Sequence, residues 1–208
     1  MSDPAKLPRR ERERLRHRQE ILDAARKVLA SRGLDGVTLE QIAREAEFAV
    51  GSIYRHFSSK EQLIEELLVD LTEPFFEELA ELGQQGLGFE ARLDAFVDLV
   101  LTRHIESEPF LMALLAAPGA FPAPGSAAGR QLHEIGLRYI SALDALLAQG
   151  QSDGVIAEGD RTPTVIALGG LIDSLVRWRM FSGQPLDADG TRRVLAVFLD
   201  GARRRGGK

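Results

Sequence analysis

The sequence predicts an all-helical protein, and two properties of the chain lead to that prediction. Apolar residues make up 44% of the 208 residues but aromatic residues only 6%, while the strong helix formers alanine, leucine, glutamate and arginine are abundant. Apolar residues also recur at intervals of three and four, the spacing of one face of an α-helix. A chain of this length forms one large domain or two small ones.

Capping signals divide the N-terminal part into four predicted helices. Thr38 and Gln41 fit a capping box, in which each side chain satisfies a free amide of the other residue. Ser58 or Ser59 begins the last of the four helices, and Pro74 inside it is expected to kink or break it. The four helices are expected at about 13–32, 38–47, 50–57 and 58 or 59 to 82.

Five further helices are predicted after a glycine-rich linker at 83–88. Pro109 suits the first position of a helix, so one helix is expected to end just before it and the next to begin there. Gly169 and Gly170 interrupt a strongly apolar helix, and close approach by another helix would account for them. The five helices are expected at about 89–107, 110–117, 130–149, 162–178 and 188–204.

Residues 38–60 predict a helix-turn-helix, which makes DNA the first partner to consider. At 100° per residue, the second helix turns Val50, Ile53 and Phe57 toward the core and Arg55 away from it. Small residues let a helix approach DNA closely, and arginine donates two hydrogen bonds to guanine. The predicted base-reading residues are Gly51, Ser52 and Arg55, and the predicted phosphate contacts, which fix register, are Thr38, Tyr54, His56 and Lys60. An ordinary surface helix with a solvated arginine is the alternative.

The charge distribution supports DNA as a partner, although the net charge of the chain is −5. Residues 1–60 hold 13 Lys and Arg against 9 Asp and Glu, a net charge of +4, and residues 61–208 hold 13 against 22, a net charge of −9. The basic excess therefore coincides with the motif. The arginine-rich run 9–18 is either an arm that follows the phosphate backbone or enters a minor groove, or a solvated extension.

Residues 18–70 resemble the DNA-binding domain of the TetR (tetracycline repressor) family of transcriptional regulators. The resemblance begins in RQEILDAARKVLASRGLDGVTLEQIAREA and continues through VGSIYRHFSSKEQLIEELL. A small pair, an apolar residue, Tyr, any residue, His and Phe, followed by Lys-Glu-x-Leu, is nearly specific to that family. Phe48 stands where the family usually has glycine, so either the turn differs in shape or Phe48 packs against the domain.

The resemblance implies a three-part chain: a flexible basic arm (1–14), a helix-turn-helix DNA-binding domain (15–62) and a larger helical ligand-binding and dimerisation domain (63–208). In the family, the last two helices pair with those of a second subunit, and both terminal helices here are apolar on more than one face. Completion of the monomer core is the alternative. The residues expected at a subunit interface are Leu168, Gly169, Ile172, Leu175, Val176, Val194 and Phe198.

The resemblance also implies a pocket for a small hydrophobic or amphipathic effector in the C-terminal helices. The apolar candidates are equally compatible with plain core, His104 with a satisfied core histidine, and Asp173 with a pair to Arg177 one turn on. The expected lining residues are Phe96, Val100, His104, Phe110, Met112, Leu115, Phe121, Tyr139, Asp173, Arg177 and Trp178.

Enzymatic chemistry has little support in the sequence. The chain has no cysteine and four histidines, and it contains no HExxH, GxSxG or glycine-rich phosphate motif. No catalytic residue, metal site or cofactor is expected, and neither a signal peptide nor a membrane span. The sequence thus predicts a cytoplasmic, homodimeric regulator that binds a near-palindromic double-stranded operator, most simply a repressor released by its effector. An effector-independent DNA-binding protein of the same fold is the alternative.

Overall fold

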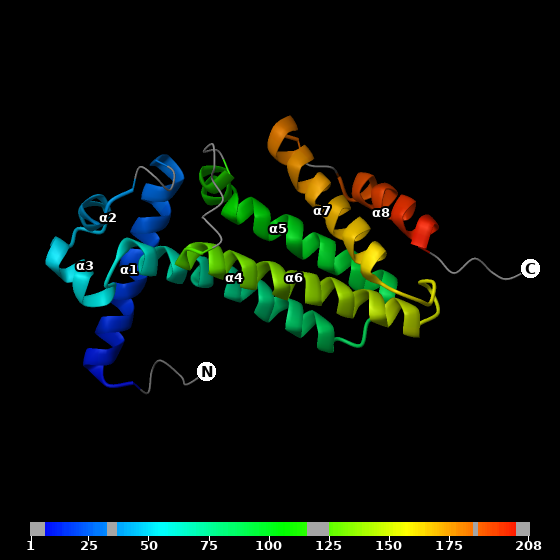
Figure 1. Cartoon of the computed structure of the whole chain (residues 1–208), viewed down its shortest axis with the longest axis horizontal. Helices are drawn as coiled ribbons and strands as arrows, with labels where there is room; N and C mark the ends of the chain where they lie inside the picture. The colour runs from blue at the N-terminus through cyan, green and yellow to red at the C-terminus, as the bar shows by residue number, and fades with distance from the viewer. Residues whose placement is uncertain (1–6, 33–36, 116–124, 185–186, 203–208) are drawn as a thin grey trace, which may run out of the picture. The chain divides into compact units, whose positions relative to one another are not determined.

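The computed structural model describes residues 7–32, 37–115, 125–184 and 187–202, and within them every regular element is a helix (Figure 1). The all-helical prediction is therefore confirmed. The chain forms two compact units, unit 1 (Met1–Leu71 and Ser107–His133) and unit 2 (Thr72–Glu106 and Glu134–Lys208). The helices are α1 (Arg9–Arg32), α2 (Leu39–Glu45), α3 (Val50–His56), α4 (Lys60–Gln84), α5 (Phe89–Leu115), α6 (Ala127–Ser152), α7 (Thr162–Ser182) and α8 (Ala188–Ala202).

The N-terminal helices of unit 1 enclose a small apolar core, with α2 lying against α1 and α3 (Figure 1). One stripe of α1 is buried because its apolar residues recur at helical spacing. The next three helices pack on this stripe, and the contact removes the apolar surfaces of α2 and α3 from water. Helices as short as α2 and α3 are not stable in isolation and depend on such packing. The buried side chains include Ile21, Ala25, Val28 and Leu29 of α1, Ile42 of α2, Ile53 of α3 and Leu63 and Leu67 of α4.

The predicted caps of α2 and α4 are present. The Thr38 hydroxyl accepts a hydrogen bond from the Gln41 amide at 3.3 Å, and the Thr38 amide donates to Gln41 Oε1 at 3.0 Å. At the start of α4, Ser59 Oγ accepts from the Gln62 amide at 3.2 Å, which identifies Ser59 as the cap of the two serines considered. These bonds satisfy amides that helix geometry leaves without intrahelical partners.

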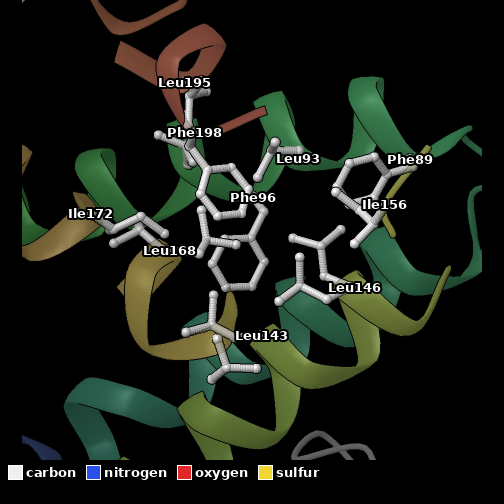
Figure 2. Packing of buried hydrophobic residues seen from close by; sticks show 14 of the residues in the cluster. Phe89, Leu93, Phe96, Leu143, Leu146, Ile156, Leu168, Ile172, Leu195 and Phe198 are labelled. Carbon is white, nitrogen blue, oxygen red and sulfur yellow. The ribbon is translucent and has the colours of Figure 1, made fainter. Parts of the chain in front are cut away.

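Unit 2 has its own core, shared by α5, α6, α7 and α8 (Figure 2). Each helix contributes a buried stripe of large apolar side chains, and α7 and α8 lie side by side (Figure 1). Gly169 of α7 faces this core, since an added Cβ would lie 3.4 Å from Leu143 Cδ1. The close approach expected at this glycine is therefore to α6 of the same chain. The labelled residues in Figure 2 are Phe89, Leu93, Phe96, Leu143, Leu146, Ile156, Leu168, Ile172, Leu195 and Phe198.

Two prolines lie inside helices instead of ending them. α4 includes Pro74, and α5 runs without a break through Pro109, so the predicted division into helices at 89–107 and 110–117 is wrong. An internal proline removes one backbone donor and costs about 3 kcal/mol. Tertiary packing along helices of 25 and 27 residues outweighs that local penalty.

The first helix begins earlier than predicted. α1 starts at Arg9, so residues 9–14 of the expected flexible arm are helical. Arg9 Nε pairs with Glu13 Oε1 at 2.9 Å across one helical turn, a spacing that favours the helix. α4 passes from unit 1 to unit 2 at Leu71, and residues 107–133 are grouped with unit 1.

We expect Gly150→Ala to lower the free energy of unfolding by about 1–3 kcal/mol, the range for overpacking a core. The new Cβ would lie 2.6 Å from Ile156 Cγ1 and 2.8 Å from Phe89 Cδ2. Urea denaturation of the full chain measures the change. Gly136→Ala is the matched control in the same helix, where an added Cβ meets nothing within 4 Å, and it should gain up to about 1 kcal/mol. Equal stability of both variants would contradict tight packing at Gly150.

Candidate nucleic-acid interface

The turn between α2 and α3 contains no glycine and places its one left-handed residue, among those described, before Phe48. The residue with positive φ is Glu47, at 59°, and not Phe48. The Phe48 amide donates to the Ala43 carbonyl at 2.8 Å, and the Phe48 ring meets the His17 ring edge-on at 5.2 Å. Phe48 therefore packs against the domain, which is one of the two possibilities raised by the sequence. Glu47, the exposed residue before Phe48, has the left-handed conformation, which costs a non-glycine residue about 1–2 kcal/mol.

The recognition helix α3 divides into a buried and an exposed side much as its periodicity predicts. Ile53 and the following Phe57 are fully buried, whereas Val50, predicted to join them, is only half-buried. Val50 is the first residue of the helix, so one side of it has no preceding turn to cover it. Arg55 and Gly51 are exposed, and no atom lies within 4 Å of a Cβ added at Gly51.

Two of the predicted base-reading residues contact each other directly. Arg55 Nη2 donates to Ser52 Oγ at 2.7 Å. The residues are one turn apart on the exposed side, and a guanidinium has five donors, so most remain available to a base. The hydrogen bond holds Arg55 over the face that carries Gly51 and Ser52, which lessens the conformational entropy that binding would remove.

The predicted phosphate-contacting residues are spread along three helices rather than gathered at one point. Thr38 is at the start of α2, Tyr54 and His56 are on α3, and Lys60 opens α4. Tyr54 is 53% exposed and has the reach for a backbone contact. The Thr38 amide is already used in the capping box. Its hydroxyl accepts from the Gln41 amide and, after the glutamate's own amide, helps to lower the pKa of Glu40, so a phosphate would compete with these partners.

His56 is an imidazole in a positively charged setting. Burial first, and then the charges of His17, Arg18, Arg14 and Arg55, lower its pKa from the ordinary value of 6.5. The His17 and His56 rings are 6.3 Å apart. These effects favour the neutral imidazole, whose ring can donate a hydrogen bond but carries no full charge.

Arg18 has a role that periodicity and composition did not reveal, because it was counted with the arginine-rich run. Its Nη1 donates to the His56 carbonyl at 2.9 Å, at the end of α3. Its guanidinium lies 4.5 Å from the centre of the Phe57 ring, and it forms an ion pair with Glu66 of α4. Burial, followed by the charge of Arg14, lowers the pKa of Arg18.

A signal for this role exists in the spacing. Arg18 lies three residues before Ile21 and seven before Ala25, and both of these are buried. Residues at those intervals share one helix face, so Arg18 belongs to the buried stripe of α1. Farther along, Arg26 Nη2 and Gln19 Nε2 reach Asp70 Oδ2 at 3.0 and 3.3 Å, which ties α1 to the next turn of α4.

In unit 2, the structure brings together only some of the residues predicted for an effector pocket. Phe96 and Val100 are buried in the core, and the Tyr139 ring lies 6.0 Å from the Phe96 ring. The Tyr139 hydroxyl is buried without a partner in the described part of the chain, and burial, then Asp173, raises its pKa. Three predicted lining residues on α7 are exposed: Asp173, Arg177 and Trp178. The side chains of His104, Phe110, Met112 and Leu115, and all of Phe121, lie outside the described residues.

The residues predicted for a subunit interface lie mainly inside the chain itself. Five of the seven are buried, namely Leu168, Ile172, Leu175, Val176 and Phe198. Gly169 approaches α6, and Val194 packs against the same core. Within the chain, the most apolar stripe of each helix faces its own core. The apolar residues that α7 and α8 leave exposed are Ile166 at 69%, Trp178 at 56%, Phe181 at 82% and Val197 at 74%.

Neither a metal site nor a membrane span is found among the described residues. They contain no group of three or more His, Cys, Asp or Glu side chains placed to hold a metal ion. Within the same ranges, no helix has both the length and the hydrophobicity needed to cross a bilayer.

Comparison with known proteins agrees with the geometry of the N-terminal unit. Residues 21–67 match the family of bacterial regulatory proteins described as the tetR family. The HTH-type transcriptional repressor KstR2 of Rhodococcus jostii is 39% identical over 80 residues, which are 38% of this chain and 39% of that repressor. The fatty acid metabolism regulator protein of Bacillus subtilis is 26% identical over 171 residues, 77% of this chain and 82% of the regulator.

A solved structure extends the similarity to most of the fold. The transcriptional regulator FadR from Bacillus subtilis, in complex with stearoyl-CoA, superposes with a TM-score of 0.75 at 23% identity, covering 89% of this chain and 99% of FadR. At that identity the likeness concerns the fold alone, whereas residues 21–67 match the family in sequence as well. Residues 21–67 thus form a DNA-binding domain of the TetR family of bacterial regulatory proteins, and the rest of the chain shares the fold of that family's solved members.

Proposed function

We propose that this protein is a sequence-specific DNA-binding transcriptional regulator, a repressor that a small hydrophobic or amphipathic effector releases from its operator. The observation that carries the proposal is the exposed face of α3, where Arg55 is held by Ser52 beside the open Gly51. A helix with this face inserts into a major groove and reads bases. Its relatives include a protein named as a transcriptional repressor, which supports regulation over enzymatic activity.

The DNA partner is a near-palindromic double-stranded operator read by a homodimer. A two-fold dimer carries two recognition helices and therefore matches two half-sites. The proposed dimer surface consists of Ile166 and Phe181 of α7 and Val197 of α8, whose exposure is unusual for large apolar side chains on two adjacent helices. A second copy of the chain would cover them. Such a regulator acts in the cytoplasm, where the operator is.

The effector is proposed to bind in unit 2. The FadR structure contains stearoyl-CoA. In the core of this chain, the apolar ring of Phe96 lies beside Tyr139, whose buried hydroxyl has no hydrogen-bond partner in the described part of the chain. An amphipathic molecule suits that combination. If the effector favours an arrangement of the two subunits' recognition helices that fits the operator poorly, DNA and effector weaken each other's binding by the same factor.

Arg55→Ala is expected to cost about 1–3 kcal/mol of affinity for an operator selected from random DNA and to relax preference at one base position, because alanine cannot donate the two hydrogen bonds to a guanine. Fluorescence anisotropy with the operator and single-base variants measures both effects. Tyr54→Phe is the control for a backbone contact and should weaken all sequences alike.

Gly51→Ala tests the close approach in the same assay. The new methyl group has open space in the free protein, so loss of operator binding with unimpaired folding would mean that DNA occupies that space. Unchanged operator affinity in Arg55→Ala would contradict its base-reading role.

Arg18→Gln is expected to weaken operator binding without changing its salt dependence, because Arg18 holds α3 and α4 and does not contact phosphate. The slope of the logarithm of the binding constant against the logarithm of salt concentration falls by about 0.9 for each phosphate that the protein no longer neutralises. Arg14→Gln is the matched control on the exposed side of α1, where a phosphate contact would reduce the slope. A reduced slope in Arg18→Gln would mean that Arg18 contacts DNA, and Glu66→Gln, which removes its partner, should reproduce its effect.

Val197→Glu is expected to convert the dimer to a monomer, since a carboxylate would be buried at the centre of an apolar contact. Sedimentation velocity measures the mass of each variant. Leu137→Glu is the matched control, because Leu137 is an exposed leucine on α6 outside the proposed surface, and it should leave the mass unchanged. A Val197→Glu protein that remains dimeric at all concentrations would rule out this surface.

A further inference from the structure

A hollow of about 130 Å³ lies between α4, α5 and α6 in unit 2 and is partly open to solvent. Small residues create the space, since Gly83, Ala142 and Ala145 present no bulk to it. Its wall is otherwise formed by large apolar side chains, and Arg92 is the one residue among those lining it with a polar side chain. The lining residues are Leu79, Leu82, Gly83, Arg92, Phe96, Ala142, Ala145 and Leu146.

Arg92 is held in place but not neutralised. Its Nη2 donates to the Gly83 carbonyl at 3.1 Å, at the end of α4. Its Nε is buried and has no hydrogen-bond partner in the described part of the chain. Among the same residues, no carboxylate forms an ion pair with Arg92. The charge of Arg92 therefore has no counter-ion among the described residues, and an anion from outside the chain that meets the remaining guanidinium donors would supply one. The guanidinium presents adjacent donors whose geometry matches the two oxygens of a carboxylate.

The size of the hollow limits the apolar part of a ligand. An apolar cavity of about 150 Å³ accommodates benzene, so a hydrocarbon of about six carbons fits here. We propose that this hollow binds a small amphipathic carboxylate, with its hydrocarbon against Phe96 and Leu146 and its carboxylate on Arg92. As an effector site the assignment rests on the proposed function, but binding itself does not require DNA.

Hexanoate and 1-hexanol test the proposal as a matched pair of probes, because they share the hydrocarbon and differ in charge. Titration calorimetry of the full chain without DNA should give hexanoate an affinity ten- to a hundredfold higher than that of 1-hexanol, the range for a hydrogen bond to a charged group. Arg92→Gln should abolish this preference and leave 1-hexanol binding in place. If the substitution only deformed the hollow, both affinities would fall together.

Ala145→Leu tests the location independently of charge. Ala145 is exposed at the rim, so the larger side chain narrows the hollow without entering the core, and both probes should bind at least tenfold more weakly. Ala80→Leu, at an exposed position of α4 outside the lining, should change neither. Absence of saturable hexanoate binding, or a hexanoate preference that survives in Arg92→Gln, would overturn the proposal.

Operator binding is measured separately on the same proteins. Arg92-dependent hexanoate binding by a chain that binds no operator would refute the proposed function and leave the carboxylate site standing. Operator binding by a chain that does not bind hexanoate would refute the carboxylate site and leave the proposed function standing.

Discussion

The DNA-binding unit depends on one partly buried cation. Arg18 joins α1 to the carbonyl at the end of α3, to the ring of Phe57 and to the carboxylate of Glu66 on α4. Each of these groups favours the charge in that partly buried position, and removing one partner weakens the attachment of α1 to α3 or α4. The direction of α3 is therefore set by a contact on the side opposite to the one that would meet DNA.

The same constraint links the recognition helix to α4, which continues from unit 1 into unit 2. Arg26 and Gln19 extend the connection of α1 and α4 to Asp70, at the last turn before unit 2 begins. Beyond it, Arg138 of α6 forms an ion pair with Glu73 and lies 3.8 Å from the centre of the Phe76 ring, both on α4. Each unit thus holds its own part of α4 by charged contacts.

Periodicity alone located most of the recognition helix. It assigned Ile53 and Phe57 to the core and Arg55 to the exposed face because a two-turn helix has little freedom once its apolar side is buried. It placed Val50 too deep, since periodicity ignores the missing turn before the first residue of a helix. It also passed over Arg18, because a charge in an arginine-rich run suggests solvent unless its position on the apolar face is weighed.

The sequence by itself determined the helical class, the capping box of α2, the helix-turn-helix and the resemblance to the family, since these depend on local propensity and on short motifs. Only the tertiary structure decided which of several apolar faces each C-terminal helix buries within its own chain. Leu168 and Ile172 were assigned to a partner subunit and belong to the monomer core, while Ile166 and Val197 are exposed. The physical reason is that hydrophobic burial has no direction, so an apolar residue can face any partner, and only the packed arrangement of all the helices selects one.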